Sequence, residues 1–195
     1  MSPFTKPRIV RKAKPRRTFS DNTYRKALPS LLTDFDRRCA YSLQHVEKVG
    51  WKVMEVDHFD PTLKGHQRNA YENLFPSTRH CNGSKSDIWP SREAREQGVR
   101  FLNPCEEEDY GSQIFEDSRT HLLVGTTPAA SYHIRVLGLN APFLVNERAE
   151  RAALIQLLNE TIVTVSNSDQ ALRKVEEVRE IVARMIPEIP PPPIG

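Results

Sequence analysis

One stretch in the first half of the chain gathers the residue types that phosphodiester chemistry uses. It contains Asp57 next to His58, then Asn73, and then Asn82 followed by Lys85. Hydrolysis of a phosphodiester needs a water made nucleophilic and a cation that stabilises the charge on the phosphate. Histidine exchanges a proton near neutral pH, and carboxylate and amide oxygens suit Mg²⁺. The order of these residues, more than any one of them, points to metal-assisted hydrolysis.

The positions of these residues suggest how they could share the work. Asp57 and His58 are adjacent in a strand expected over residues 53–59. Neighbouring side chains of an extended strand point to opposite faces, so one can bind a metal ion while the other faces the attacking water. The amide oxygen of Asn82 can complete the metal shell. Asn73 can fix the imidazole by a hydrogen bond to it or to its loop.

The elements around this motif are expected to be short. Residues 21–36 are typical of helical turns, which Pro29 interrupts, and residues 62–76 of a loop and a tether. Residues 77–87 are expected to form a short helix or turns. A β-hairpin is expected over residues 113–124.

The set resembles the HNH endonuclease family, whose members share a β-hairpin, a helix and one divalent metal ion between them. The family pattern is approximately C-x-x-C, then [DE]-H-φ-x-P, then N-L, then C-x-x-C-N-x-x-K. Its last three elements resemble residues 56–61 (VDHFDP), 73–74 (NL) and 81–85 (CNGSK). The resemblance implies an α+β fold with a small ββα-metal core, surrounding helices and a C-terminal helical hairpin.

The resemblance also implies a role for each residue of the motif. His58 would be the general base, and Asp57 and Asn82 would be the metal ligands. Asn73 would position the His58 loop, and Lys85 would lie near the scissile phosphate or an adjacent one. The implied cofactor is Mg²⁺ or Mn²⁺, and the implied substrate is DNA.

The cysteines depart from the family pattern. Many members hold a structural zinc between two C-x-x-C pairs. Here the first pair is Cys39 with Ser42 in place of its second cysteine, and the second pair is Cys81 with Thr78 in place of its first. Two thiolates do not make the usual four-ligand site, so we expect Cys39 and Cys81 to be close-lying buried thiols rather than zinc ligands. Three further donors could fill the gaps, although their spacing does not favour it: His45, His80 and Cys105.

The net charge of +3 hides a basic N-terminal segment. The first 38 residues contain eleven Lys and Arg against three Asp, which gives +8 there and leaves −5 for the rest. We expect residues 1–20 to form a flexible basic arm, either a solvated tail, a grip on nucleic-acid phosphates, or a dock for an acidic partner protein. The residues assigned to nucleic-acid binding are Lys12, Lys14, Arg16, Arg17 and Arg79.

The rest of the pattern predicts the domain organisation. A nuclease domain is expected over residues 21–145. Apolar residues at helical spacing predict two further helices, packed on the core as a hairpin over residues 146–186. Residues 187–195 are a Pro-rich tail.

A finer resemblance concerns biological context. The C-A-Y-S and D-H-F-D-P runs, with the later segments 101–107 and 137–140, resemble bacterial HNH proteins of antiphage defence. In the Septu-type systems among them, a nuclease works beside an ABC-type ATPase. Residues 137–140 also fit a plain turn after a strand.

Composition limits the other classes of protein. No apolar run approaches the roughly 20 residues that a membrane helix needs, and no apolar core follows the basic N-terminus as in a signal peptide. With only three cysteines, we expect a cytoplasmic protein that does not enter a membrane. Two alternatives to a nuclease stay open: a catalytically silent nucleic-acid-binding module that keeps the HNH frame, and a zinc-binding interaction domain without hydrolysis.

Overall fold

The structure is a computed structural model of the chain. It describes residues 2–3, 9–12, 19–106, 112–165 and 172–178. The chain divides into two compact units, residues 1–141 and 142–195. Helices and two small antiparallel sheets give the first unit an α+β fold, as the sequence predicted. The boundary lies four residues before the one expected after residue 145.

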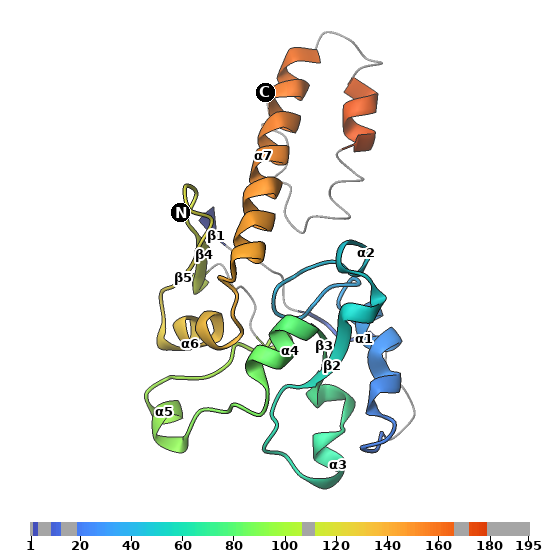
Figure 1. The fold of residues 1–195 in the computed structure, drawn as a ribbon, viewed down its shortest axis with the longest axis vertical. Helices are drawn as coiled ribbons and strands as arrows, with labels where there is room; N and C mark the ends of the chain where they lie inside the picture. Colours follow the sequence, from blue (N-terminus) through green and yellow to red (C-terminus); the bar gives the residue numbers. More distant parts are fainter. Residues whose placement is uncertain (1, 4–8, 13–18, 107–111, 166–171, 179–195) are drawn as a thin grey trace. The chain divides into compact units, whose positions relative to one another are not determined.

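A β-hairpin followed at once by a helix forms the centre of the first unit. Strands β2 (Met54–His58) and β3 (Leu74–Thr78) are antiparallel, with the first residue of β2 opposite the last of β3. Helix α4 (Arg79–Lys85) begins directly after β3 and packs on both strands (Figure 1). Strand β3 was not expected from the sequence, because Pro76 lies within it. Both strands of a two-stranded sheet are edge strands, a setting that tolerates proline.

Short helices surround this hairpin. The segment between its strands contains α3 (Gly65–Arg68) and η3 (Tyr71–Asn73), where a loop was expected. Before the hairpin come η1 (Tyr24–Ala27) and α1 (Leu28–Asp34). Pro29 lies in the first turn of α1, where its missing N–H costs nothing, so it does not interrupt the helix. The remaining short helices are α2 (Val46–Val49), η2 (Trp51–Val53) and α5 (Arg92–Glu96).

A second sheet lies apart from the hairpin. Its strands are β1 (Ser2–Pro3), β4 (Ile114–Glu116) and β5 (Leu123–Gly125), in the order β1-β4-β5. The predicted hairpin over residues 113–124 is therefore confirmed in outline. Helix α6 (Pro128–Val136), which the sequence analysis did not predict, packs on β5. Residues 137–140 thus follow a helix, not a strand.

The hairpin lies between two apolar clusters. It contributes Phe75 to the larger cluster, which includes Phe35, and Val56 and Leu74 to the smaller one, which includes Leu31. All five side chains are buried. The ends of β2 and β3 are therefore held between packed layers, which fixes the side chains that project from them.

Residues 9–12 are packed on the first unit, which corrects the expectation of a flexible arm at these positions. The Arg11 guanidinium lies 5.0 Å and 4.7 Å from the ring centroids of Tyr71 and Phe75, and it donates a 2.9 Å hydrogen bond to the carbonyl of Leu74. Contact with aromatic faces stabilises a guanidinium that has lost water. Lys12 is exposed, while Lys14, Arg16 and Arg17 lie outside the described residues.

The second unit is helical. Helix α7 (Pro142–Val165) begins four residues before the predicted position. Residues 172–178, within the second predicted helix, are also helical. The rest of that predicted helix and the Pro-rich segment 187–195 lie outside the described residues. None of the described helices is long and apolar enough to span a membrane.

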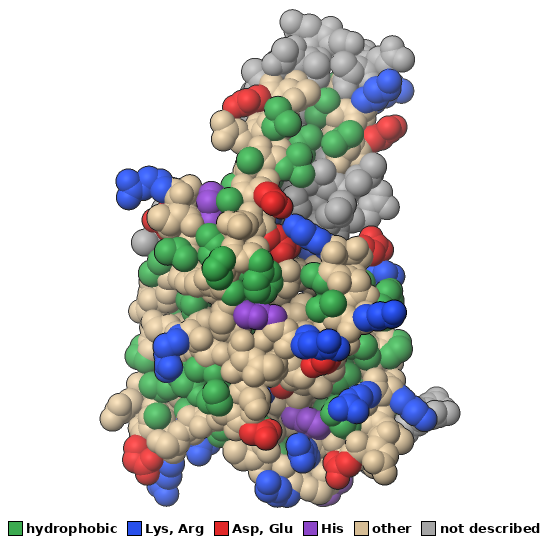
Figure 2. All heavy atoms as spheres, in the orientation of Figure 1, with side chains coloured by type: hydrophobic (Ala, Val, Ile, Leu, Met, Phe, Trp, Pro, Cys, Tyr) green, Lys and Arg blue, Asp and Glu red, His purple; other side chains and the backbone are tan. Residues whose placement is uncertain are grey.

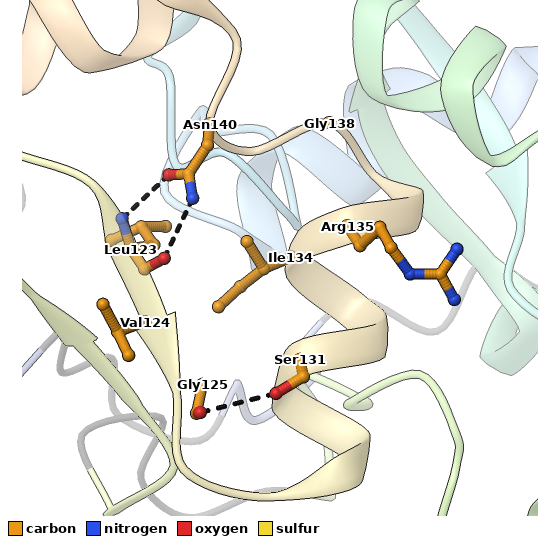
Figure 3. Close-up of a pocket in the computed structure, with 8 residues that line it drawn as sticks. All are labelled: Leu123, Val124, Gly125, Ser131, Ile134, Arg135, Gly138 and Asn140. Carbon is orange, nitrogen blue, oxygen red and sulfur yellow. Dashed lines mark hydrogen bonds between the residues drawn. The ribbon is translucent and has the colours of Figure 1, made fainter.

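Side chains close the outer edge of β5. The Asn140 side chain accepts a hydrogen bond from the backbone N–H of Leu123 at 2.8 Å and donates one to its carbonyl at 2.9 Å, as a neighbouring strand would (Figure 3). The Ser131 hydroxyl donates to the carbonyl of Gly125 at 3.4 Å. Closing an edge strand in this way prevents further strand pairing. Asn140 therefore has a structural role.

We expect Asn140→Ala to lower the free energy of unfolding of the first unit by about 1–3 kcal/mol, because both backbone groups of Leu123 would lose their partner. Urea denaturation followed by circular dichroism measures this change. Asn22→Ala is the matched control, since Asn22 is exposed. Equal stability of the two variants would contradict the role assigned to Asn140.

Candidate active site

The two faces of β2 carry different chemistry. Glu55 and Asp57 contact α4, whereas His58 contacts Tyr24 in η1 and Asn69 after α3. This is the alternation that an extended strand imposes on neighbouring side chains. The Asp57 and His58 side chains therefore diverge, as expected from the sequence.

Asp57 is buried beside a buried cation. Its Oδ1 lies 3.1 Å from Lys85 Nζ, and its Oδ2 accepts a short hydrogen bond from the Tyr41 hydroxyl. Lys85 Nζ also donates to the carbonyl of His58 at 2.7 Å. Burial raises the pKa of Asp57 to about 6, although Lys85 and Tyr41 both favour the carboxylate.

The burial of Lys85 corrects its predicted role. Its side chain has no exposed surface. A phosphate therefore cannot reach the ammonium in this arrangement, and Lys85 acts on Asp57 instead. A position of Lys85 at the phosphate was implied by the family resemblance alone. The ion pair with Asp57 depends on packing between α4 and β2, which the sequence pattern does not encode.

Asn82 is hydrogen-bonded to Glu55, a carboxylate that was not among the residues expected at the site. Its Nδ2 donates to Glu55 Oε2 at 2.7 Å, and Arg79 Nε donates to Glu55 Oε1 at 2.9 Å. Partial burial tends to raise the pKa of Glu55, but these two hydrogen bonds outweigh it and hold the pKa below its usual value. Glu55 could have been found from its position two residues before Asp57, on the same face of the strand.

Oxygen donors thus line the seam between β2 and α4. Glu55, Asp57 and Asn82 offer carboxylate and amide oxygens, the ligands that suit Mg²⁺ or Mn²⁺. The chemistry of the donor set therefore fits the expected ion. In the described part of the chain, however, no three His, Cys, Asp or Glu side chains gather as a metal-binding group. A cation that binds Asp57 must also compete with the ammonium of Lys85.

His58 is half-buried on the other face of the strand. Its ring lies against that of Tyr24, with centroids 4.6 Å apart, and its Nε2 is 2.9 Å from Asn69 Oδ1. Burial lowers the pKa of His58, and the positive charges of Arg68 and Lys85 lower it further, against the opposing hydrogen bond with Asn69. His58 is therefore held in the neutral form, which can accept a proton.

Asn73 ties down the segment that follows His58. Its Oδ1 accepts from the backbone N–H of Asp60 at 2.8 Å. Its Nδ2 donates to the carbonyls of Asp60 and Arg68 at 3.1 Å and 2.9 Å. The Asn73 side chain is therefore hydrogen-bonded to the loop and not to the imidazole of His58.

The two thiols of the incomplete C-x-x-C pairs lie together. Cys39 and Cys81 are buried and close together, as expected from the sequence. They form no disulfide, and their side chains are hydrogen-bonded to each other. The Cys39 sulfur also accepts from the backbone N–H groups of Ser42 and Thr78, each at 3.4 Å. Burial tends to raise the pKa of Cys39, but hydrogen bonds from Cys81, Ser42 and Thr78 outweigh it and lower the pKa.

The other donors considered for a zinc site are engaged elsewhere. His45 caps α2 by accepting from the backbone N–H of Glu47 at 3.2 Å. His80 Nε2 lies 3.0 Å from the carbonyl of Gly138. Cys105 is partly buried against the larger apolar cluster. None of these contacts adds a ligand to Cys39 and Cys81.

Four basic residues belong to, or lie next to, the elements that contact the His58 side chain. Arg25 and Lys26 project from η1 and are exposed, and Figure 2 shows several Lys and Arg side chains on this part of the molecule, with Asp and Glu between them. Lys64 and Arg68, with Asp87, line a pocket of about 370 Å³ beside the segment after His58. We call Arg25, Lys26, Lys64 and Arg68 the basic rim.

A second pocket, between β5 and α6, offers less chemistry. It has a volume of about 500 Å³, and Arg135 is the one ionisable residue among those that line it (Figure 3). Residues of the β2–β3 hairpin do not contribute to it. We therefore assign the candidate active site to the hairpin.

Comparison of the chain with protein-family models, curated proteins and solved structures finds no match.

We expect Lys85→Met to lower the free energy of unfolding by about 3–5 kcal/mol at neutral or higher pH, because it leaves the Asp57 carboxylate buried without a cation. The substitution raises the pKa of Asp57 further. The penalty is therefore present above that pKa and decreases as pH falls through it, because the protonated form has no charge to bury. Denaturation of the variant at about pH 8 and about pH 5 measures the difference.

The double variant Asp57→Asn, Lys85→Met tests the cause, since it removes both charges and should regain most of the lost stability. Lys64→Met, at an exposed lysine, is the control. Additive effects of the two single substitutions would contradict a direct interaction.

Proposed function

We propose that this protein is a metal-dependent endonuclease of the HNH type that hydrolyses phosphodiester bonds in DNA. The observation that supports this most is the position of His58. A neutral, half-buried imidazole lies at the end of β2, next to Asp57 and within the β2–β3–α4 unit. Asn73 fixes the segment that follows it.

The residues of the hairpin would divide the work between its two faces. His58 takes a proton from the attacking water, which requires the neutral imidazole that burial favours. Glu55, Asp57 and Asn82 would hold the cation through their oxygens. When bound, Mg²⁺ or Mn²⁺ supplies charge stabilisation at the phosphate. Lys85 holds the Asp57 carboxylate in place and sets how readily another cation reaches it.

DNA would approach over the basic rim. Each phosphate that a Lys or Arg neutralises releases counterions, which favours binding whatever the base sequence. Arg79 is largely exposed but already paired with Glu55, so it contributes less than the rim. Lys14, Arg16 and Arg17 lie outside the described residues, and their role in binding DNA stays a prediction.

A cytoplasmic role in antiphage defence beside an ABC-type ATPase is the biological context that we propose. The support is the sequence resemblance in segments 101–107 and 137–140. Part of the second segment has a packing role, since Gly138 has a positive φ and contacts His80, and Asn140 closes β5.

We expect His58→Ala to reduce cleavage of plasmid DNA by about 10²–10⁴-fold in the presence of Mg²⁺ or Mn²⁺, since a general base contributes a factor of this size. DNA binding should change little, and a chelator should abolish cleavage by the wild type. His66→Ala is the matched control, because His66 is an exposed histidine of the nearby helix α3. DNA binding without metal-dependent cleavage by the wild type would instead indicate the silent binding module.

We expect Lys26→Ala combined with Lys64→Ala to weaken DNA binding and to flatten the slope of log affinity against log salt by about 0.9 for each phosphate that the protein no longer neutralises. Fluorescence anisotropy at several salt concentrations measures the slope. Arg92→Ala is the control, because Arg92 belongs to α5, which lies away from η1 and α3 (Figure 1). An unchanged slope would mean that DNA does not contact the rim.

A further inference from the structure

We propose that Asp21 and Asn69 are positioning residues that hold His58 with its proton on Nε2, so that Nδ1 is the atom that accepts a proton from water. This inference rests on the proposed function for its catalytic part, while the hydrogen-bond arrangement stands independently of it. Neither residue belongs to the sequence motif.

The direction of the hydrogen bonds follows from Asp21. Asn69 Nδ2 lies 2.8 Å from Asp21 Oδ1. An ionised carboxylate can only accept hydrogen bonds, so the amide must present its NH₂ group to Asp21. The carbonyl oxygen of Asn69 therefore faces His58, where Oδ1 lies 2.9 Å from Nε2.

That direction fixes the tautomer of His58. A carbonyl oxygen can only accept, so Nε2 must donate and carry the hydrogen. A neutral imidazole has a single N–H, which leaves the lone pair on Nδ1. Among the described residues, Nδ1 of His58 has no hydrogen-bond partner, so its lone pair remains available to a water molecule.

The arrangement is held from two sides. Asn69 is buried and follows Arg68, whose carbonyl accepts a hydrogen bond from Asn73. Asn73 therefore helps to hold the backbone next to Asn69, and Asn69 in turn is hydrogen-bonded to His58. Asp21 and Tyr24 belong to one turn, closed by a 2.9 Å hydrogen bond from the Tyr24 N–H to the Ser20 carbonyl. This turn supplies both the carboxylate that orients Asn69 and the ring that lies against the imidazole.

The test is nitrogen NMR of the full chain labelled with ¹⁵N-histidine, at a pH well above the pKa of His58. The signals of His58 are assigned by their loss in His58→Gln. We expect the wild type to show the hydrogen on Nε2. In Asp21→Asn the orientation of the Asn69 amide is no longer fixed, so the tautomer with the hydrogen on Nδ1 should gain population. Asn69→Ala should produce the same shift.

Activity is the second readout. Asp21→Asn and Asn69→Ala should lower kcat by about 10–100-fold, the range found when the hydrogen-bond partner of a metal-binding histidine is removed, while KM changes little. Glu72→Gln is the control for Asp21→Asn, because Glu72 is also an exposed acidic residue of the first unit. It should leave both the tautomer and kcat unchanged.

The two measurements distinguish a failure of the positioning role from a failure of the proposed function. A hydrogen on Nδ1 in the wild type, or an unchanged tautomer in Asp21→Asn, overturns the positioning role even if the protein cleaves DNA. If the tautomer shifts in the variants as expected but the wild type does not cleave DNA, the proposed function is wrong and the positioning role is supported. The expected shift with unchanged kcat overturns Nδ1 as the catalytic atom.

Discussion

The buried ion pair between Lys85 and Asp57 is the interaction on which the candidate site depends. Two charges that have left water must be paired closely, so the pair fixes where the last turn of α4 meets β2. Arg79, Asn82 and Lys85 follow one another at intervals of three, which places them on neighbouring parts of one helix face. Once Lys85 is placed, Asn82 and Arg79 can reach Glu55. The whole polar seam between helix and strand follows from this one contact.

The strand between the two faces separates two kinds of chemistry. Carboxylates and the ammonium lie toward α4, and the imidazole lies toward η1. His58 can therefore stay neutral close to an ion pair, since burial and the positive charges of Arg68 and Lys85 all favour the uncharged ring. The backbone connects the two faces, because the carbonyl of His58 accepts from Lys85. A change at the ion pair would therefore affect the position of the imidazole through the backbone of β2.

The thiol cluster shows how the start of α4 is held by hydrogen bonds. Cys39 accepts N–H groups from Ser42 on one side and from Thr78 on the other, and it contacts Cys81. These contacts join the turn after residue 39 to the junction of β3 and α4. If one of these hydrogen bonds were lost, a polar group would be left buried without a partner, which would lower the stability of the protein. The hydrogen bonds therefore stabilise this junction.

The sequence by itself determined which residues take part and in what order, because motif spacing records them directly. It predicted the strand that carries Asp57 and His58, a short helix or turns near residue 82, the buried thiols, the helix that begins the second unit and the divergence of Asp57 from His58. Only the tertiary structure decided their partners. Glu55, Asn69 and Asp21 join the site from outside the motif, Lys85 is buried against Asp57, and Arg11 packs on aromatic rings. The physical reason is that spacing along the chain fixes which face a side chain occupies, whereas its partner depends on segments far away in sequence that pack against that face.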